Sequence, residues 1–171
     1  MDILKAVKER RSIRNFQKKM IPDDLIGKLM EALIWAPSAG NLQARKFYFV
    51  RKDTVKQRIA AAALNQNFIA EAPLVIVGCT DSRIHQKYGE RGVHLYSIQD
   101  VAVSIMGMML VAHEYGLGSV WVGAFREDDV GRILGTPKHL RPVAIVPVGY
   151  PAKIPHAPPR VSKKEAVEVI E

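Results

Sequence analysis

The chain has 171 residues, of which 48% are hydrophobic and 25% charged, a composition typical of one globular domain and unlike that of disordered, collagen-like or coiled-coil proteins. Its one cysteine, Cys79, excludes an intrachain disulfide framework and a cysteine-based zinc cluster, and favours a reducing, cytoplasmic location. The net charge of +8 comes entirely from the first 60 residues, which hold 14 Lys and Arg against 6 Asp and Glu.

Apolar spacing predicts two N-terminal helices, over residues 2–10 and 22–35, and Pro37 ends the second. Later apolar runs predict strands, and 3.6-residue periodicity predicts further helices. These elements are a strand over 46–51, a helix over 54–64, a buried strand over 73–80, an exposed connection over 81–92, a helix over 94–115, a strand over 119–123, a helix over 127–134 and a strand over 142–150. Pro147 suits an edge or a bulge, because proline cannot donate to a ladder.

The helix expected over 94–115 is apolar around most of its circumference, so it must be buried on nearly all sides. A domain of this size has little room for a fully central helix, which predicts that a second copy of the chain covers part of it. The longest apolar run, Val101 to Ala112, has 12 residues. A membrane span needs about 20, so we expect a buried helix and no membrane association.

Residues 151–171 are expected to form a proline-rich arm followed by a helix. Four prolines lie between Pro151 and Arg160, and such a segment is extended and semi-rigid. Ser162 and Glu165 then have the spacing of a capping box. We therefore expect a single domain over residues 1–171, whose C-terminal arm and helix reach over another surface.

A basic cluster near the N-terminus combines three guanidinium groups with a hydroxyl: Arg10, Arg11, Ser12 and Arg14. Arginine forks match phosphate oxygens, and alternate residues of an extended segment point the same way. Together with the local charge excess, the cluster predicts a phosphate clamp; the alternative is a solvated helix end.

The loop from Pro37 to Gln43 is built from small and uncharged polar residues. Ser38, Asn41 and Gln43 offer donors and acceptors that suit a neutral, flat heterocycle. The same composition is also that of an ordinary turn.

Motifs for hydrolytic and metal chemistry are missing from the sequence. It has no G-x-S-x-G elbow, H-E-x-x-H pair or P-loop, and its five histidines are scattered, so no metal site is predicted. Gly116-Leu-Gly118 follows a helix rather than a strand, which does not support a Rossmann turn.

Four segments, in order, resemble the flavin-dependent nitroreductase family. They are R-R-S-I-R-x-F, then A-P-S-A-G-N-x-Q, then G-L-G-S-V-W-V-G after the long helix, and a basic residue in the proline-rich arm. The resemblance covers essentially the whole chain and marks a short, compact member. It implies an α+β fold with a central, mostly antiparallel sheet flanked by helices, and an intertwined homodimer with one FMN at each of two sites across the interface.

The resemblance also implies which residues bind the cofactor. One group would hold the phosphate side of FMN: Arg10, Arg11, Ser12, Arg14 and Arg160. A second group would lie against the flavin of the other subunit: Pro37, Ser38, Ala39, Asn41 and Gln43. A third group would contact the flavin ring itself. Gln66, or Asn65 as the alternative, would lie at its pyrimidine edge. The backbone amides near N5 and O4 would be those of Trp121, Val122 and Gly123.

One departure concerns the end of the second segment. Family loops often continue Asn-x-Gln-Pro-Trp, whereas here Gln43 is followed by Ala44-Arg45-Lys46. Two charges therefore replace the aromatic residue, which leaves substrate preference and pocket depth open.

The implied function is an FMN-dependent oxidoreductase that transfers hydride from NADH or NADPH, via flavin N5, to a small acceptor such as a nitroaromatic or a quinone. The cofactor carries the redox chemistry, so no catalytic side chain is expected. An alternative of the same fold is a flavin-handling or reductive dehalogenating enzyme. An alternative of another class is a basic nucleic-acid-binding module, although the basic cluster has only Phe16 as a nearby aromatic and no reading motif accompanies it.

Overall fold

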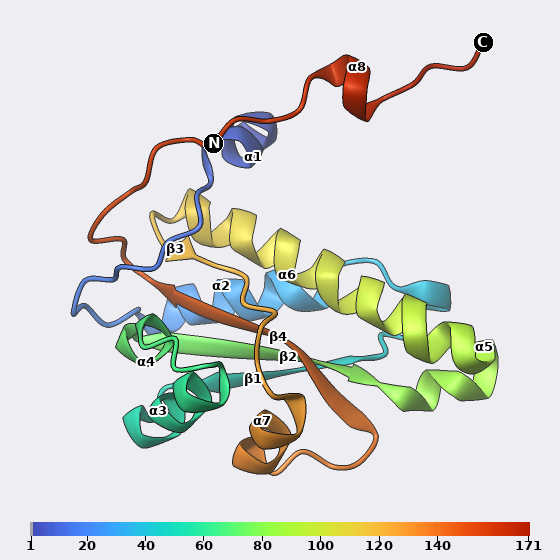
Figure 1. Ribbon diagram of the computed structural model, residues 1–171, viewed down its shortest axis with the longest axis horizontal. Helices are drawn as coiled ribbons and strands as arrows, with labels where there is room; N and C mark the ends of the chain where they lie inside the picture. Colours follow the sequence, from blue (N-terminus) through green and yellow to red (C-terminus); the bar gives the residue numbers. More distant parts are fainter. Residues whose placement is uncertain (1) are drawn as a thin grey trace.

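A computed structural model describes residues 2–171. At its centre is a four-stranded sheet in the order β1-β2-β4-β3, and every pairing is antiparallel. The strands are β1 (Arg45–Val50), β2 (Leu74–Asp81), β3 (Gly118–Ser119) and β4 (Leu140–Gly149). Figure 1 shows a helical layer on each face of this sheet, so the expected α+β class is confirmed.

The two layers contain different helices (Figure 1). One face is covered by α2 (Asp23–Ile34) and α6 (Ser97–Glu114), which pack against each other, and α6 also packs on β2. The other face is covered by α3 (Asp53–Ala62), α4 (Phe68–Glu71) and α7 (Glu127–Leu134). The remaining elements are α1 (Ile3–Glu9), the 3-10 turns η1 (Ala39–Asn41) and η2 (Ser82–Ile84), α5 (His85–Arg91), the π-helical turn η3 (Gly92–Tyr96) and α8 (Lys163–Ala166).

The strands contribute side chains to the core on both faces of the sheet, because successive side chains point to opposite faces. Every residue of β2 is buried; Val75 and Val77 join the cluster under α3, whereas Leu74 and Ile76 join the cluster under α6. A strand buried on both faces needs a continuous apolar run, which is why this element is evident from the sequence.

The long helix is less deeply buried than its composition suggests. One side of α6 is in the core, through residues such as Val101 and Met108, which are 0% exposed. On the other side Ile98, Val103 and Met106 are 36%, 46% and 39% exposed. The sequence therefore predicts the helix correctly, and one chain leaves part of its apolar surface uncovered.

The same region is the one stretch of the described chain with the length and apolar character of a membrane span. It runs over Ser82–Glu114, 33 residues, and 44% of its apolar window is buried. Gly89, with a φ of +54°, interrupts its helical geometry. Because the apolar part packs on α2 and β2, its composition is that of a core helix.

The exposed connection expected over 81–92 is wrong, because this segment is helical. Asp81 begins η2 by accepting a hydrogen bond from the backbone N–H of Arg83 at 3.0 Å. The chain then runs through α5 and η3 into α6. Its polar residues face solvent and Gly89 breaks the periodicity, so the apolar pattern that identifies other helices is absent.

The strand expected over 119–123 is shorter than predicted. Only Gly118 and Ser119 pair continuously with β4, and Val122 forms a separate bridge to Ile145. Pro147 lies between these two pairings on β4. Ile145 exchanges both backbone hydrogen bonds with Val122, and a residue two positions along points to the same side. Pro147 therefore lies in an inner strand, not at an edge. The N–H that proline lacks would point toward β3, whose pairing with β4 is interrupted there, and not toward β2.

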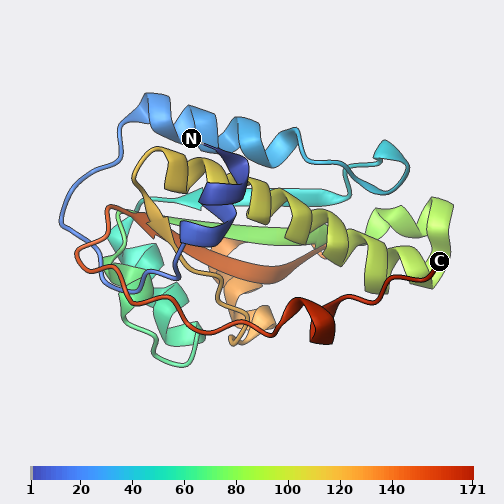
Figure 2. The ribbon, with the colours of Figure 1, turned by 90° about the horizontal axis from the view of Figure 1, so that it is seen from above.

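The C-terminal arm lies outside the two layers (Figure 2). Every residue from Ala152 to Glu171 is exposed. The capping box is present: Ser162 Oγ accepts from the N–H of Glu165, and the Glu165 carboxylate accepts from the N–H of Ser162. The surface that the arm covers stays a prediction.

Candidate functional site

The guanidinium groups of Arg10, Arg11 and Arg160 form an arginine cluster, although they come from the two ends of the chain. Arg10 follows the last residue of α1, where the backbone becomes extended. Burial lowers the pKa of Arg10, and the charges of Arg11 and Arg160 lower it further. Mutual repulsion of this kind favours an anion between the groups.

Within this cluster, Arg10 has a buried hydrogen-bond donor without a partner. Its Nη1 atom is buried and has no hydrogen-bond partner among the described residues, and the same holds for Nε2 of His113. Both side chains line a cavity of about 310 Å³ together with Gly118 and Ser119. Buried polar atoms without partners are costly, so this cavity suits a ligand that brings hydrogen-bonding oxygens. His113 was not predicted from the sequence, where no pattern around it distinguishes it from a core histidine.

The guanidinium of Arg11, unlike that of Arg10, is engaged by nearby backbone carbonyls. Its Nη1 donates to the carbonyl oxygens of Lys8 at 2.6 Å and of Arg10 at 2.9 Å. It therefore caps the C-terminal end of α1, where a cation also interacts favourably with the helix dipole. Its contribution to an anion site is long-range charge.

The segment after α1 is fixed by β3. Ser12 forms a parallel bridge with Ser119, and the N–H of Ile13 donates to the Ser119 carbonyl at 3.0 Å. Gly118 permits this approach, because a Cβ there would overlap the side chain of Ile13. Arg14 then lies over the ring of Phe68 in α4, 5.9 Å from its centroid. These contacts hold the segment with the basic residues in an extended conformation beside the end of the sheet.

Gln66 joins the turn after α3 to the segment before α7. Its Nε2 donates to the carbonyl oxygens of Ala63 at 2.9 Å and of Ala124 at 3.1 Å. The two preceding residues, Leu64 and Asn65, have φ values of +57° and +60°, an uncommon conformation for non-glycine residues that concentrates at functional sites. Of the two candidates, Gln66 has the anchored side chain, with Oε1 left to accept, and Asn65 is exposed.

The segment 121–123 passes close to this turn. Trp121 is 39% exposed and Gly123 is exposed. The N–H of Val122 donates to Ile145 at 2.8 Å inside the sheet. The backbone amide of Val122 is thus already used, which leaves those of Trp121 and Gly123 to meet a ligand.

The loop Pro37–Gln43 has an unusual backbone. Gly40, Asn41 and Gln43 have φ values of +53°, +55° and +52°, and a Cβ on Gly40 would overlap the hydroxyl of Tyr88. Ser38 Oγ accepts from the N–H of Gln43 at 3.0 Å, which closes the loop on itself. Such strain persists only where surrounding contacts hold it.

Two residues outside the predicted set supply those contacts. The guanidinium of Arg45 donates to the carbonyl oxygens of Ile34, Ala36 and Pro37 at 2.7 to 3.2 Å. Burial lowers the pKa of Arg45, and the nearby carboxylate of Asp100 partly offsets this. Asp100 itself is buried, and its Oδ1 accepts from the N–H of Ala39 at 2.9 Å. Asp100 directly precedes the apolar run of α6, and nothing in the sequence around it indicates this contact.

The predicted site residues form two groups at opposite ends of one chain. Ala39 contacts the first turn of α6, whereas Ser119 follows the end of that helix. At 1.5 Å per residue, the intervening helix places the groups roughly 20–25 Å apart. Figure 2 shows the loop after α2 and the β3 region at opposite ends of the molecule, as does Figure 1. The structure therefore brings Arg10, Ser12, Arg14, Gln66 and the 121–123 segment to one end and the loop to the other.

No cluster of His, Cys, Asp and Glu among residues 2–171 is arranged to hold a metal ion. Cys79 is buried in the sheet, and burial raises its pKa to about 12. A neutral, enclosed thiol is neither a ligand nor a nucleophile.

Comparison with known proteins identifies the class of fold and then the family. The structure superimposes on nitroreductase A from Vibrio parahaemolyticus with a TM-score of 0.92, over 100% of this chain and 77% of that chain, at 23% identity. The chain is 33% identical to an NADH dehydrogenase of Thermus thermophilus over 90% of this chain and 88% of the relative. It is 27% identical to an FMN reductase (NADPH) of Bacillus subtilis over 94% of this chain and 70% of the relative.

The model of the nitroreductase family matches residues 7–90 and 56–150. The chain therefore belongs to the nitroreductase family, and its fold is the nitroreductase fold. Family and fold were both expected from the four ordered segments.

Proposed function

We propose that this protein is an FMN-dependent NAD(P)H oxidoreductase that reduces a small acceptor such as a nitroaromatic or a quinone, with NADH or NADPH as the donor. The observation that carries the proposal is the arginine cluster with its unpartnered, buried Arg10 Nη1 atom. Relatives named as an NADH dehydrogenase and an FMN reductase (NADPH) support the choice of donor and cofactor.

The residues present fit FMN. A phosphate in the cavity beside Arg10 would supply the missing acceptor for Nη1, and Arg160 and Ser12 would complete its charge and hydrogen bonds. Gln66 Oε1 and the amides of Trp121 and Gly123 would face the ring of the same cofactor. When bound, FMN supplies hydride acceptance and donation at N5.

The chain's own contribution is positioning and electrostatics. Arg14, held over Phe68, and the free amides of the 121–123 segment would stabilise negative charge on a ligand beside them. No side chain is needed to donate or remove a proton, so we assign no catalytic residue.

We further propose that the functional unit is a homodimer in which the loop Pro37–Gln43 of one copy completes the site of the other. The loop lies roughly 20–25 Å from the arginine cluster within one chain, too far for both to contact one flavin. Exposed apolar side chains on three neighbouring helices offer the interface: Val7 on α1, Met30 and Ile34 on α2, Val103 and Met106 on α6. A cytoplasmic location is part of the same proposal.

Visible absorption of the purified protein tests the proposal directly. We expect a yellow protein with a flavin spectrum, or a colourless one that gains this spectrum on incubation with FMN, and oxidation of NADH or NADPH that depends on an added nitroaromatic or quinone. A protein that takes up no FMN would overturn the proposal. Oxygen consumption with free reduced FMN separates this activity from a flavin-handling one.

A further inference from the structure

A cavity beside the loop Pro37–Gln43 is separate from the cavity that Arg10 lines. It has a volume of about 650 Å³ and lies between β1, the η2–α5 segment and the residues that lead into β4. Sites for small molecules and cofactors are typically about 300–1,000 Å³, so this cavity is large enough for a nucleotide rather than a single ion.

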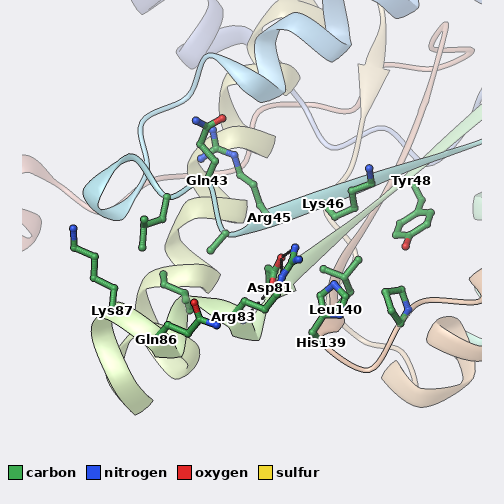
Figure 3. Close-up of a pocket in the computed structure, with 14 residues that line it drawn as sticks. Gln43, Arg45, Lys46, Tyr48, Asp81, Arg83, Gln86, Lys87, His139 and Leu140 are labelled. Atoms are coloured by element: carbon green, nitrogen blue, oxygen red, sulfur yellow. Dashed lines mark hydrogen bonds and ion pairs between the residues drawn. The ribbon is translucent and has the colours of Figure 1, made fainter.

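Its charge is strongly positive, and part of that charge is available. Figure 3 shows the Asp81–Arg83 pair at the centre of the cavity, where Nε of Arg83 donates to both carboxylate oxygens at 3.0 Å. Arg45 lines the wall, but its guanidinium is held by backbone carbonyls. Lys46 and Lys87 are exposed and take part in none of the ion pairs found within residues 2–171, and Lys87 Nζ lies 6.0 Å from the centroid of the Tyr88 ring.

These two lysines lie on opposite sides of the cavity (Figure 3). Lys46 comes from β1 and Lys87 from α5, with the Asp81–Arg83 pair between them. An elongated ligand with more than one anionic group can contact both ammonium groups at once. A single small anion would reach only one of them.

The rest of the lining favours an aromatic base beside the phosphates. Tyr48 and Gln86 present a hydroxyl and an amide, while Leu42, Ile84 and Leu140 supply apolar surface. Apolar side chains set beside polar groups can hold the face of a heterocycle while the polar groups fix its orientation.

The cavity also adjoins the loop that we place against the flavin. Gln43 belongs both to this loop and to the cavity wall. Lys46 directly follows Ala44 and Arg45, which stand where the family resemblance leads one to expect Pro-Trp. A ligand with one end at the flavin can therefore extend its other end into this cavity.

We propose that the cavity binds the adenosine phosphates of the reducing dinucleotide, and that Lys46 and Lys87 favour NADPH over NADH. The inference rests on the proposed function for its choice of ligand. The 2′-phosphate is the group that distinguishes the two donors, and exposed ammonium groups bind phosphate as point charges.

The test compares a double variant, Lys46→Ala/Lys87→Ala, with a control, Lys18→Ala/Lys52→Ala, that removes the same charge from exposed positions elsewhere. Calorimetry on the protein before and after FMN loading measures Kd for adenosine 2′,5′-bisphosphate and for AMP. We expect the bisphosphate to bind more tightly than AMP to the wild type. We expect its Kd to rise about tenfold or more in the double variant, which corresponds to the loss of one charge-assisted contact, and to change little in the control.

Steady-state kinetics give a second readout. The KM for NADPH should rise in the double variant by a larger factor than the KM for NADH, with kcat maintained for both donors. An unchanged NADPH-to-NADH ratio, or equal binding of the bisphosphate to wild type and double variant, would overturn the inference. Lack of FMN uptake would instead overturn the proposed function, because bisphosphate binding does not require the flavin.

Discussion

Arg10 is a residue whose environment changes when the proposed ligand binds. Without an anion its Nη1 atom is buried and unpaired. A charge-assisted hydrogen bond contributes roughly 1.5–3 kcal/mol, so Arg10→Ala should raise the Kd for FMN about 10- to 100-fold. Quenching of FMN fluorescence measures this.

Arg11→Ala is the matched comparison, because that side chain caps α1 through Lys8 and Arg10. We expect a smaller change in FMN affinity than for Arg10→Ala. Equal effects of the two substitutions would contradict the assignment of Arg10 as the direct phosphate ligand.

Cys79 shows how burial alone sets a residue's chemistry. Its pKa is raised to about 12 by burial, whereas an unfolded cysteine ionises near 8.5. The folded-state pKa is the higher one, so the contribution to stability is fully present below about pH 8.5 and is lost as pH rises toward 12. Compared with Cys79→Ala, the wild type should lose up to about 1.4 kcal/mol of unfolding free energy per pH unit above 8.5.

Urea unfolding of both proteins at pH 7, 9 and 10 measures that difference. Taking the difference cancels the titration of the lysines and of every tyrosine except Tyr48, whose pKa is raised by burial and by Cys79. A gap that stays constant with pH would mean that the thiol ionises in the folded protein.

At the scale of elements, the loop Pro37–Gln43 depends on Arg45. Arg45→Ala removes the donors to the carbonyl oxygens of Ile34, Ala36 and Pro37. We expect a loss of roughly 1–3 kcal/mol in unfolding free energy, and weaker FMN retention because the loop is no longer held.

Arg51→Ala is the control for that experiment, since Arg51 makes an exposed ion pair with Asp23 at 2.8 Å. Such pairs contribute about 1 kcal/mol or less. Thermal unfolding and FMN release on both variants make the comparison. If Arg45→Ala affected stability and flavin retention no more than Arg51→Ala, the loop would not depend on Arg45.

Sequence reasoning succeeded where an element has one strong periodic signal. The buried strand β2 and the helix α7 were found nearly at their observed bounds, because a continuous apolar run and a clear amphipathic pattern identify them. The helical turns over 82–92 were missed because a solvent-facing helix beside Gly89 has no apolar stripe. The interrupted β3 was overestimated because its pairing depends on Pro147 in a distant strand.

At the scale of the whole molecule, the uncovered side of α6 gives the dimer proposal its test. Val103 is 46% exposed in one chain. Val103→Glu places a charge where we expect a second copy, so it should shift light-scattering mass toward the monomer and lower FMN content together. Met20→Glu, at another exposed apolar position, should change neither quantity.

The candidate site was predictable in its parts but less so in its layout. Residue types and their order pointed to Arg10, the loop and Gln66. Asp100, Arg45 and His113 were not found, because their roles depend on contacts that only the folded chain creates: a buried hydrogen bond to Ala39, carbonyls at the end of α2, and a cavity shared with Arg10.

The separation of the loop from the arginine cluster has one more consequence. If each cofactor is held by halves from different copies, subunits defective in different halves can rescue one another. A mixed pair of one Arg10→Ala chain and one chain with a damaged loop would contain one wholly intact site and one doubly broken site. Complementation on mixing two inactive preparations, up to half of the normal flavin per pair, is therefore a direct signature of shared architecture.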